Sequence, residues 1–134
     1  WYINTNQTFV FANNIVTASY GTATPIAHAD VTETINGVES TTLGLKTNLI
    51  KDLKSNVANE LAKTDWYITR KTEKSTAIPS AISTHRDLVR SRQVSIEAQI
   101  IGAADTAALE TLHTYTTTDG VQSRPLGELP VLES

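Results

Sequence analysis

The sequence contains no cysteine, and this absence removes several kinds of chemistry at once. Disulfide bonds, thiolate metal sites and cysteine nucleophiles are excluded. Methionine is also absent, even at position 1, so we expect the chain to begin at Trp1 after processing or to belong to a longer product. No apolar run approaches the roughly 18 residues that a membrane span needs, and no signal peptide opens the chain. We therefore expect a soluble protein with no membrane partner.

Large side chains are also scarce. Aromatic residues make up 6% of the 134 residues and charged residues 19%, while threonine, serine, asparagine and alanine are abundant. A chain of this length suits a single domain, residues 1–134, with a modest core. Because few bulky residues are available for that core, we expect burial to be completed against other chains.

Motifs that carry catalysis or ligand binding are missing as well. The sequence shows no HExxH, no GxSxG and no glycine-rich phosphate loop. Its histidines, His28, His85 and His113, fall in three different predicted elements, so no metal site is expected. We predict no catalytic residues, no cofactor and no enzymatic activity. An enzyme would need a pocket in which His85 or Asp65 meets a second polar group.

Charge is distributed in blocks along the chain. Residues 1–45 carry three acidic side chains and no Lys or Arg, and residues 46–92 carry ten basic and five acidic ones. Residues 93–134 return to a net charge of −5, with one arginine against six acids. The basic centre could bind phosphate backbones or pair with acidic segments of a neighbouring copy. The overall pI near 5.5 argues against nucleic acid as a partner.

Residues 1–44 are predicted to be a β-rich and irregular N-terminal segment. Thr8–Phe11 and Ile15–Tyr20 are rich in β-branched and aromatic residues, and the turn signal Asn13-Asn14 separates them. A second small hairpin is possible around Asn36-Gly37. Such ribbons are marginal alone and need a surface to pack on.

Residues 45–115 are predicted to form a helical core. The clearest helix covers residues 45–63, where apolar residues recur at the helical period. A second helix is predicted from about Pro79 to Ile101 and a third at 106–115, capped by Asp105. Residues 71–77 are predicted to be a polar loop. The aromatic pair Trp66 and Tyr67 is predicted to bury against the helices in the core and, together with Pro79, to anchor the hinge between the first two helices.

Two groups of residues are candidate partner contacts. Arg86 and Arg90 lie four residues apart on one predicted helix face, where they could be solvated or could clamp an acidic neighbour. Residues 116–134 read as an extended tail that docks on a neighbouring surface. Its apolar anchors are Leu126, Leu129, Val131 and Leu132. From the charge blocks and this tail we predict homo-oligomerisation, and we expect removal of Leu126–Ser134 to weaken assembly more than folding.

The predicted fold class is therefore mainly α. A helical hairpin and a third short helix would form the core, with a short N-terminal β-ribbon and an extended C-terminal tail.

The stretch Thr64–Arg92 resembles a known signature. Thr64-Asp65-Trp66-Tyr67, Arg70, Ile78-Pro79, His85-Arg86 and Arg90 are similar to the C-terminal signature of tail-fibre assembly and tail accessory proteins of tailed bacteriophages. The same signature occurs in virion structural proteins of phages of marine bacteria. Those resemble this chain further, in residues 104–110 and in the segment from Arg124 to Pro130.

This resemblance implies a setting and a function. The chain is expected to be a structural component of a bacteriophage virion, in the tail or attached to it, acting through protein–protein contacts. Its expected partners are other copies of itself and neighbouring virion proteins, and its location is the virion, assembled in the host cytoplasm. The alternative is a tail-fibre assembly chaperone that leaves the mature particle. Chaperone-like members end soon after the final arginine, whereas this chain continues well beyond Gly102, which favours the retained component.

Overall fold

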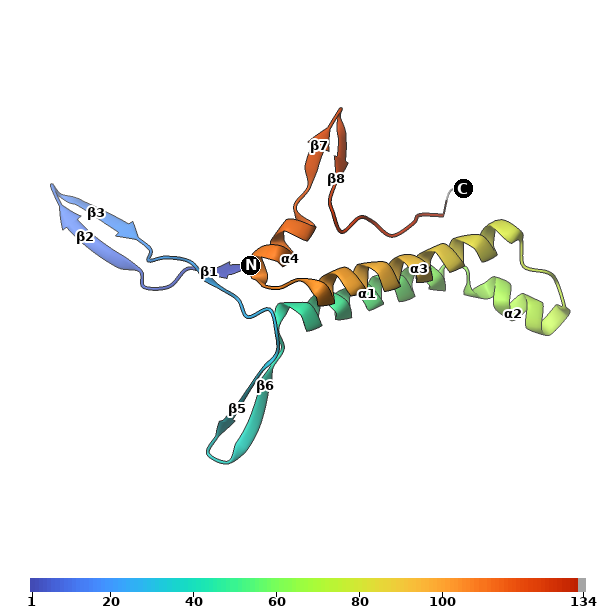
Figure 1. Ribbon diagram of the computed structural model, residues 1–134, viewed down its shortest axis with the longest axis horizontal. Coiled ribbons are helices and arrows are strands. Elements are labelled where there is room, and N and C mark those ends of the chain that lie inside the picture. The colour runs from blue at the N-terminus through green and yellow to red at the C-terminus, as the bar shows by residue number, and fades with distance from the viewer. Residues whose placement is uncertain (133–134) are drawn as a thin grey trace.

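The computed structural model describes residues 1–132, in which small β-ribbons come first and helices follow (Figure 1). The last two residues of the predicted tail, Glu133 and Ser134, lie outside this range. The helices are α1 (Leu45–Ala62), α2 (Asp65–Lys74), α3 (Ser80–Gly102) and α4 (Thr106–His113). The strands are β1 (Tyr2–Ile3), β2 (Thr8–Ala12), β3 (Ile15–Ser19), β4 (Thr24–Pro25), β5 (Val31–Ile35), β6 (Val38–Thr42), β7 (Thr116–Thr118) and β8 (Val121–Ser123).

The prediction of a mainly α fold is wrong. Helices hold 45% of the described residues and strands 23%, so the class is mixed α/β. The strands form four separate two-stranded antiparallel sheets, β1–β4, β2–β3, β5–β6 and β7–β8. The β7–β8 ribbon occupies part of the segment that was predicted to be an extended tail. Its strands are three residues each, too short for a periodicity signal, and only the turn Asp119-Gly120 indicated it.

Local turn chemistry explains three of the four ribbons. Each joins its strands through two residues with positive φ: Asn13-Asn14, Asn36-Gly37 and Asp119-Gly120. Positive φ at both central positions is the mark of a type I′ turn, whose twist matches that of the flanking strands. Asn, Asp and Gly adopt this conformation at little cost. The predicted hairpins at residues 13–14 and 36–37 are therefore confirmed.

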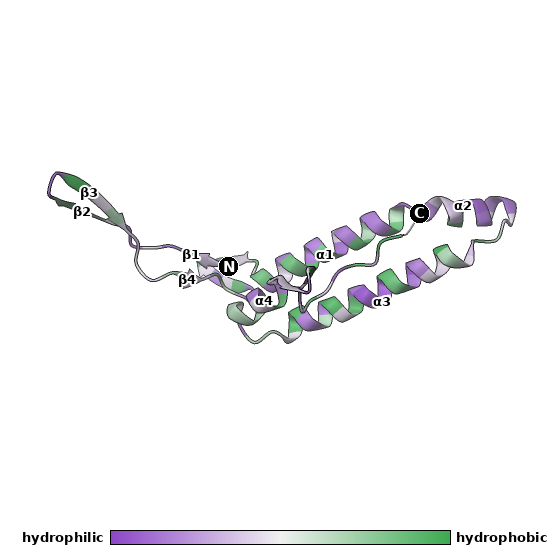
Figure 2. Cartoon of the chain, turned by 90° about the horizontal axis from the view of Figure 1, so that it is seen from above, coloured by the Kyte–Doolittle hydropathy of each residue, from purple (hydrophilic) through white to green (hydrophobic). Residues whose placement is uncertain are grey.

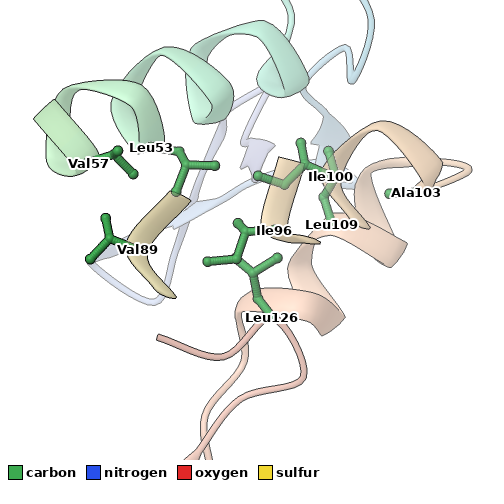
Figure 3. Packing of buried hydrophobic residues seen from close by; sticks show 8 residues of the cluster. All are labelled: Leu53, Val57, Val89, Ile96, Ile100, Ala103, Leu109 and Leu126. Atoms are coloured by element: carbon green, nitrogen blue, oxygen red, sulfur yellow. The ribbon is translucent and has the colours of Figure 1, made fainter. Parts of the chain in front are cut away.

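A small helical body holds the apolar core. Helices α1 and α3 run antiparallel, and the chain after β8 returns along them (Figure 2). Contacts from Lys46 to Ile101, Lys54 to Glu97 and Leu61 to Arg86 mark the register of the pair. Side chains from α1, α3, α4 and the returning segment meet between them (Figure 3). The cluster consists of Leu53, Val57, Val89, Ile96, Ile100, Ala103, Leu109 and Leu126.

The N-terminal segment is tied to the start of α1 by backbone groups. The N–H groups of Leu45 and Lys46 donate to carbonyl oxygens of Ala27 and His28, at 2.9 and 3.0 Å. Gly44 donates its N–H to Asp30 Oδ1 at 2.7 Å. These bonds satisfy donors that a helix N-terminus leaves without intrahelical partners. A Cβ on Gly44 would lie 2.3 Å from the backbone of Ala29, so this approach requires glycine.

Helix α2 replaces most of the predicted polar loop at 71–77. The helix continues to Lys74 and ends at Ser75, which adopts the left-handed conformation with φ 56°. Polar residues dominate its second half, which is why the sequence suggested a loop. The same residues suit an exposed helix, and Lys71 and Lys74 in its last turn interact favourably with the helix dipole.

Candidate protein-contact surfaces

The β2–β3 ribbon carries apolar side chains that no other part of residues 1–132 covers. Directly opposed residues share a face, so Phe9, Phe11, Val16 and Ala18 form one apolar face. Every residue of the two strands is exposed, and Phe11 reaches 70%. No charged residue occurs before Asp30. Because the ribbon projects away from the body (Figure 1), these side chains are available to another chain.

The β5–β6 ribbon is apolar and acidic. Its pairing places Val31, Glu33, Ile35 and Val38 on one face and Glu39 on the other. All ten strand residues are exposed. Within residues 1–132, neither glutamate forms an ion pair. This ribbon leaves the body at the start of α1, in a different direction from β2–β3 (Figure 1).

Helix α2 carries an aromatic and cationic cluster. The rings of Trp66 and Tyr67 lie 3.8 Å apart between centroids. The guanidinium carbon of Arg70 lies 4.7 Å from the Trp66 centroid and 5.4 Å from that of Tyr67, within cation–π range. No residue of α2 is buried. The cluster therefore covers the outside of the molecule at the far end of the body.

The prediction that Trp66 anchors the core is wrong. Its side chain is 51% exposed, and Tyr67 is half-buried. Because α2 begins immediately after α1, the helical turn carries the indole ring to the outer side instead of back onto the body. Pro79 is exposed and directly precedes α3, with φ −55°, close to the helical value, as the sequence suggested.

Arg86 is occupied within its own chain. It is only 7% exposed, and Nη1 lies 2.8 Å from the carbonyl oxygen of Leu61 and 2.7 Å from Thr64 Oγ1. The same nitrogen lies 2.8 Å from Asp65 Oδ1. These partners replace the acidic neighbour that the sequence suggested. Arg86 donates a hydrogen bond to a carbonyl at the C-terminus of α1. It thereby joins α1, α2 and α3 at the elbow, by which we mean the bend from α1 into α2 at residues 61–65.

Four of the residues that carry the phage-protein resemblance meet at this elbow. Thr64 and Asp65 follow α1, and His85 and Arg86 lie one turn inside α3. His85 is buried, and its Nε2 lies 3.3 Å from Glu60 Oε1. Both facing atoms are shielded from solvent. In this chain these four residues therefore form a structural joint.

The remaining predicted contact residues divide between core and surface. Arg90 is exposed and lies 3.4 Å from Asp87 one turn away. Leu126 is only 3% exposed and belongs to the core, so the tail up to this residue is part of the fold. Leu129 and Leu132 are half-buried, whereas Val131 is 77% exposed. Of the four tail anchors, Val131 is the one that remains free for another surface.

Arg92, which the sequence did not single out as a contact, holds the tail on the body. It donates from Nη2 to the carbonyl oxygen of Leu126 at 2.9 Å and from Nε to that of Glu128 at 3.1 Å. Between them, Gly127 has φ 71°, and a Cβ there would lie 1.5 Å from Arg92 Nη2. The glycine in the segment Arg124-Pro125-Leu126-Gly127 was the only sequence signal for this contact.

A groove of about 600 Å³ remains beside the returning tail. Apolar residues of α1, α3 and the tail line it, with polar groups that include Asp52, Asn56 and His113. Residues 1–132 contain no group of three or more side chains suited to holding a metal ion. None of the described helices is long and apolar enough to cross a membrane.

Comparison with known proteins yields no relative. No family model matches the chain, and neither a curated protein nor a solved structure is significantly similar to it. The function is therefore argued from the exposed surfaces and from the local resemblance at Thr64–Arg92.

Proposed function

We propose that this chain is a structural component of a bacteriophage virion, in the tail or a structure attached to it, and that it acts by contacting other protein chains. The observation that carries the assembly role is the exposure of every residue of β2–β3 and β5–β6. Two-stranded ribbons are marginally stable in water unless they pack on another surface. Apolar ribbons that find no such surface among residues 1–132 are best explained by burial against neighbouring chains.

The shape of the molecule supports the same role. A small body projects ribbons in several directions (Figure 1), which suits a protein that contacts more than one neighbour. Free strand edges also invite pairing with another chain, so a protein that keeps them exposed benefits from a defined partner. No catalytic activity is part of this proposal.

The phage setting is supported by the resemblance at Thr64–Arg92 and by its extension into residues 104–110 and 124–130. Quantitative mass spectrometry of purified phage particles tests the proposal. We expect the protein in a fixed ratio to known tail proteins after extensive purification. Its presence in infected cells together with its absence from particles would overturn a retained structural role and favour the tail-fibre assembly chaperone.

A further inference from the structure

One face of α2 is built to contact a partner. At 100° per residue, Trp66, Arg70 and Lys74 lie along one stripe, with Tyr67 and Lys71 along one edge and Glu73 along the other. Asp65 lies on the opposite side, where it pairs with Arg86 of the body. The aromatic–cationic face of α2, defined by those first five residues, therefore lies on the side away from this ion pair, with Trp66, Lys71 and Lys74 exposed and Tyr67 and Arg70 half-buried.

This face has the composition of an interaction hot spot. Tryptophan, tyrosine and arginine are the residues most enriched where binding energy concentrates. Lys71 and Lys74 at its edge are exposed and form no ion pair within the described part of the chain. A complementary partner would offer apolar side chains together with acidic ones.

The β5–β6 ribbon offers that combination. The face with Val31, Ile35 and Val38 also carries Glu33, Ser40 and Thr42, so it combines three apolar side chains with one carboxylate, and Glu39 adds a second acid on the opposite face of the same short ribbon. Residues 1–45 contain no Lys or Arg that could neutralise it. The lysines of α2 and the glutamates of the ribbon, which form no ion pairs within residues 1–132, can therefore attract each other.

The two surfaces do not meet within one chain. The ribbon ends at Thr42, just before α1, and α2 begins just after α1. An 18-residue helix spans about 27 Å, so α1 keeps the surfaces at opposite ends (Figure 1). We propose that the aromatic–cationic face of α2 binds the β5–β6 ribbon of a second copy, so that copies join head to tail.

This inference rests on the proposed assembly role and identifies a partner for it. A head-to-tail contact uses two different surfaces, so it produces closed rings or open filaments and not a symmetric dimer. Because opposite charges are involved, association should weaken as salt is added.

A charge swap tests the contact directly. The variants K71E/K74E and E33K/E39K should each weaken self-association about tenfold or more in sedimentation velocity. Mixing the two variants should restore association, because each then meets a surface of opposite sign. The quadruple variant, which has the wild-type net charge, should also recover. K51E, on an exposed lysine of α1, is the control and should associate like the wild type.

Several outcomes would overturn the inference. The first is a wild-type chain that stays monomeric up to its solubility limit. The second is a quadruple variant that does not regain self-association although circular dichroism shows that it is folded. The third is a K51E control that weakens self-association as much as the charge-swap variants do. If the wild type binds single-stranded DNA, and K71E/K74E loses this binding but still self-associates like the wild type, the face would be assigned to nucleic acid instead.

The absence of cysteine allows a second test. Single variants E33C and K71C, oxidised separately, should give few covalent dimers, whereas their mixture should form the mixed disulfide readily. Equal cross-linking of E33C with itself would contradict a head-to-tail contact. These solution results are independent of the particle analysis, so a protein found in virions but failing both tests would keep its proposed role and lose this contact.

Discussion

The helical body and the long ribbons treat their apolar side chains in opposite ways. In the body, α1 and α3 direct Leu53, Val89 and Ile100 into a shared core. In β2–β3, Phe9 and Phe11 are as apolar but face solvent. The body is therefore held by tertiary packing, whereas the ribbons are held by their turns and cross-strand pairing.

This difference separates folding from assembly. Substitutions in the body should change the free energy of unfolding of a single chain, while substitutions in the ribbons should change contacts between chains. Each substitution in the body is paired with a control whose behaviour would contradict this separation of folding from assembly if the two variants behaved alike.

The largest effect is expected at Ile100, which is almost completely buried. Ile100→Ala should lower the free energy of unfolding by about 2–5 kcal/mol, because it removes buried methyl groups and leaves a cavity. Phe9→Ala removes a larger side chain from the ribbon but should cost less than about 0.5 kcal/mol in the monomer. Urea denaturation followed by circular dichroism measures both.

The comparison between core and ribbon fails if the two variants behave alike. A loss in Phe9→Ala as large as that in Ile100→Ala, in a sample shown to be monomeric, would mean that the ribbon packs on its own body.

A smaller loss is expected at the elbow. Arg86→Ala removes charge-assisted hydrogen bonds to Leu61 and Thr64 and should cost about 2–3 kcal/mol. Arg90→Ala, four residues along the same helix, removes an exposed contact to Asp87 and should be nearly neutral. Thermal and urea unfolding of the two variants distinguish a buried joint from a solvated surface. Equal stability of both would show that the elbow does not depend on this arginine.

The sequence predicted the elements whose signals are local. Apolar spacing predicted α1 and α3, and Asn36-Gly37 predicted the second hairpin, because the helical period and type I′ turns are decided by neighbouring residues. Asp105 was correctly predicted to cap α4, where its Oδ1 accepts a hydrogen bond from Ala108 N at 2.8 Å.

Interactions between distant segments were not predictable in the same way. The sequence placed Arg86 on a helix face but could not show that this face meets the end of α1. Leu126 was an apolar residue among prolines, and its place in the core depends on how the chain returns after β8. Trp66 was assigned to the core because bulky residues usually lie there. Only the start of α2 directly after α1 puts it outside.

The attachment of the tail gives a third test. Gly127→Ala forces a side chain into positive φ and against Arg92, and should cost about 1–2 kcal/mol while loosening residues 124–132. Gly120→Ala is the matched control, because Gly120 also has positive φ but open space around it. Limited proteolysis should cleave the tail faster in Gly127→Ala only. Equal cleavage in both variants would mean that strain alone, and not the contact with Arg92, governs the tail.

The smallest effect is expected from acid. A hydrogen bond from Lys63 lowers the pKa of the Glu60 carboxyl below its ordinary value of 4.5. The charges of Lys63 and His85 add to this shift, and burial opposes it. In the unfolded chain the Glu60 carboxylate therefore takes up a proton at a higher pH than it does in the folded chain. The stabilisation from Glu60 is complete above about pH 5 and is lost as the pH falls through the folded pKa.

Glu60→Gln should therefore flatten the pH dependence of the unfolding free energy below about pH 5, with a loss at neutral pH below about 1 kcal/mol. Glu33→Gln removes a carboxylate from the β5–β6 ribbon, where no cation pairs with it among residues 1–132, and should keep the wild-type slope. Urea titrations at several pH values measure the slopes. A wild-type slope in Glu60→Gln would show that the carboxylate at the elbow does not stabilise the body, and would remove one of the differences between body and ribbon.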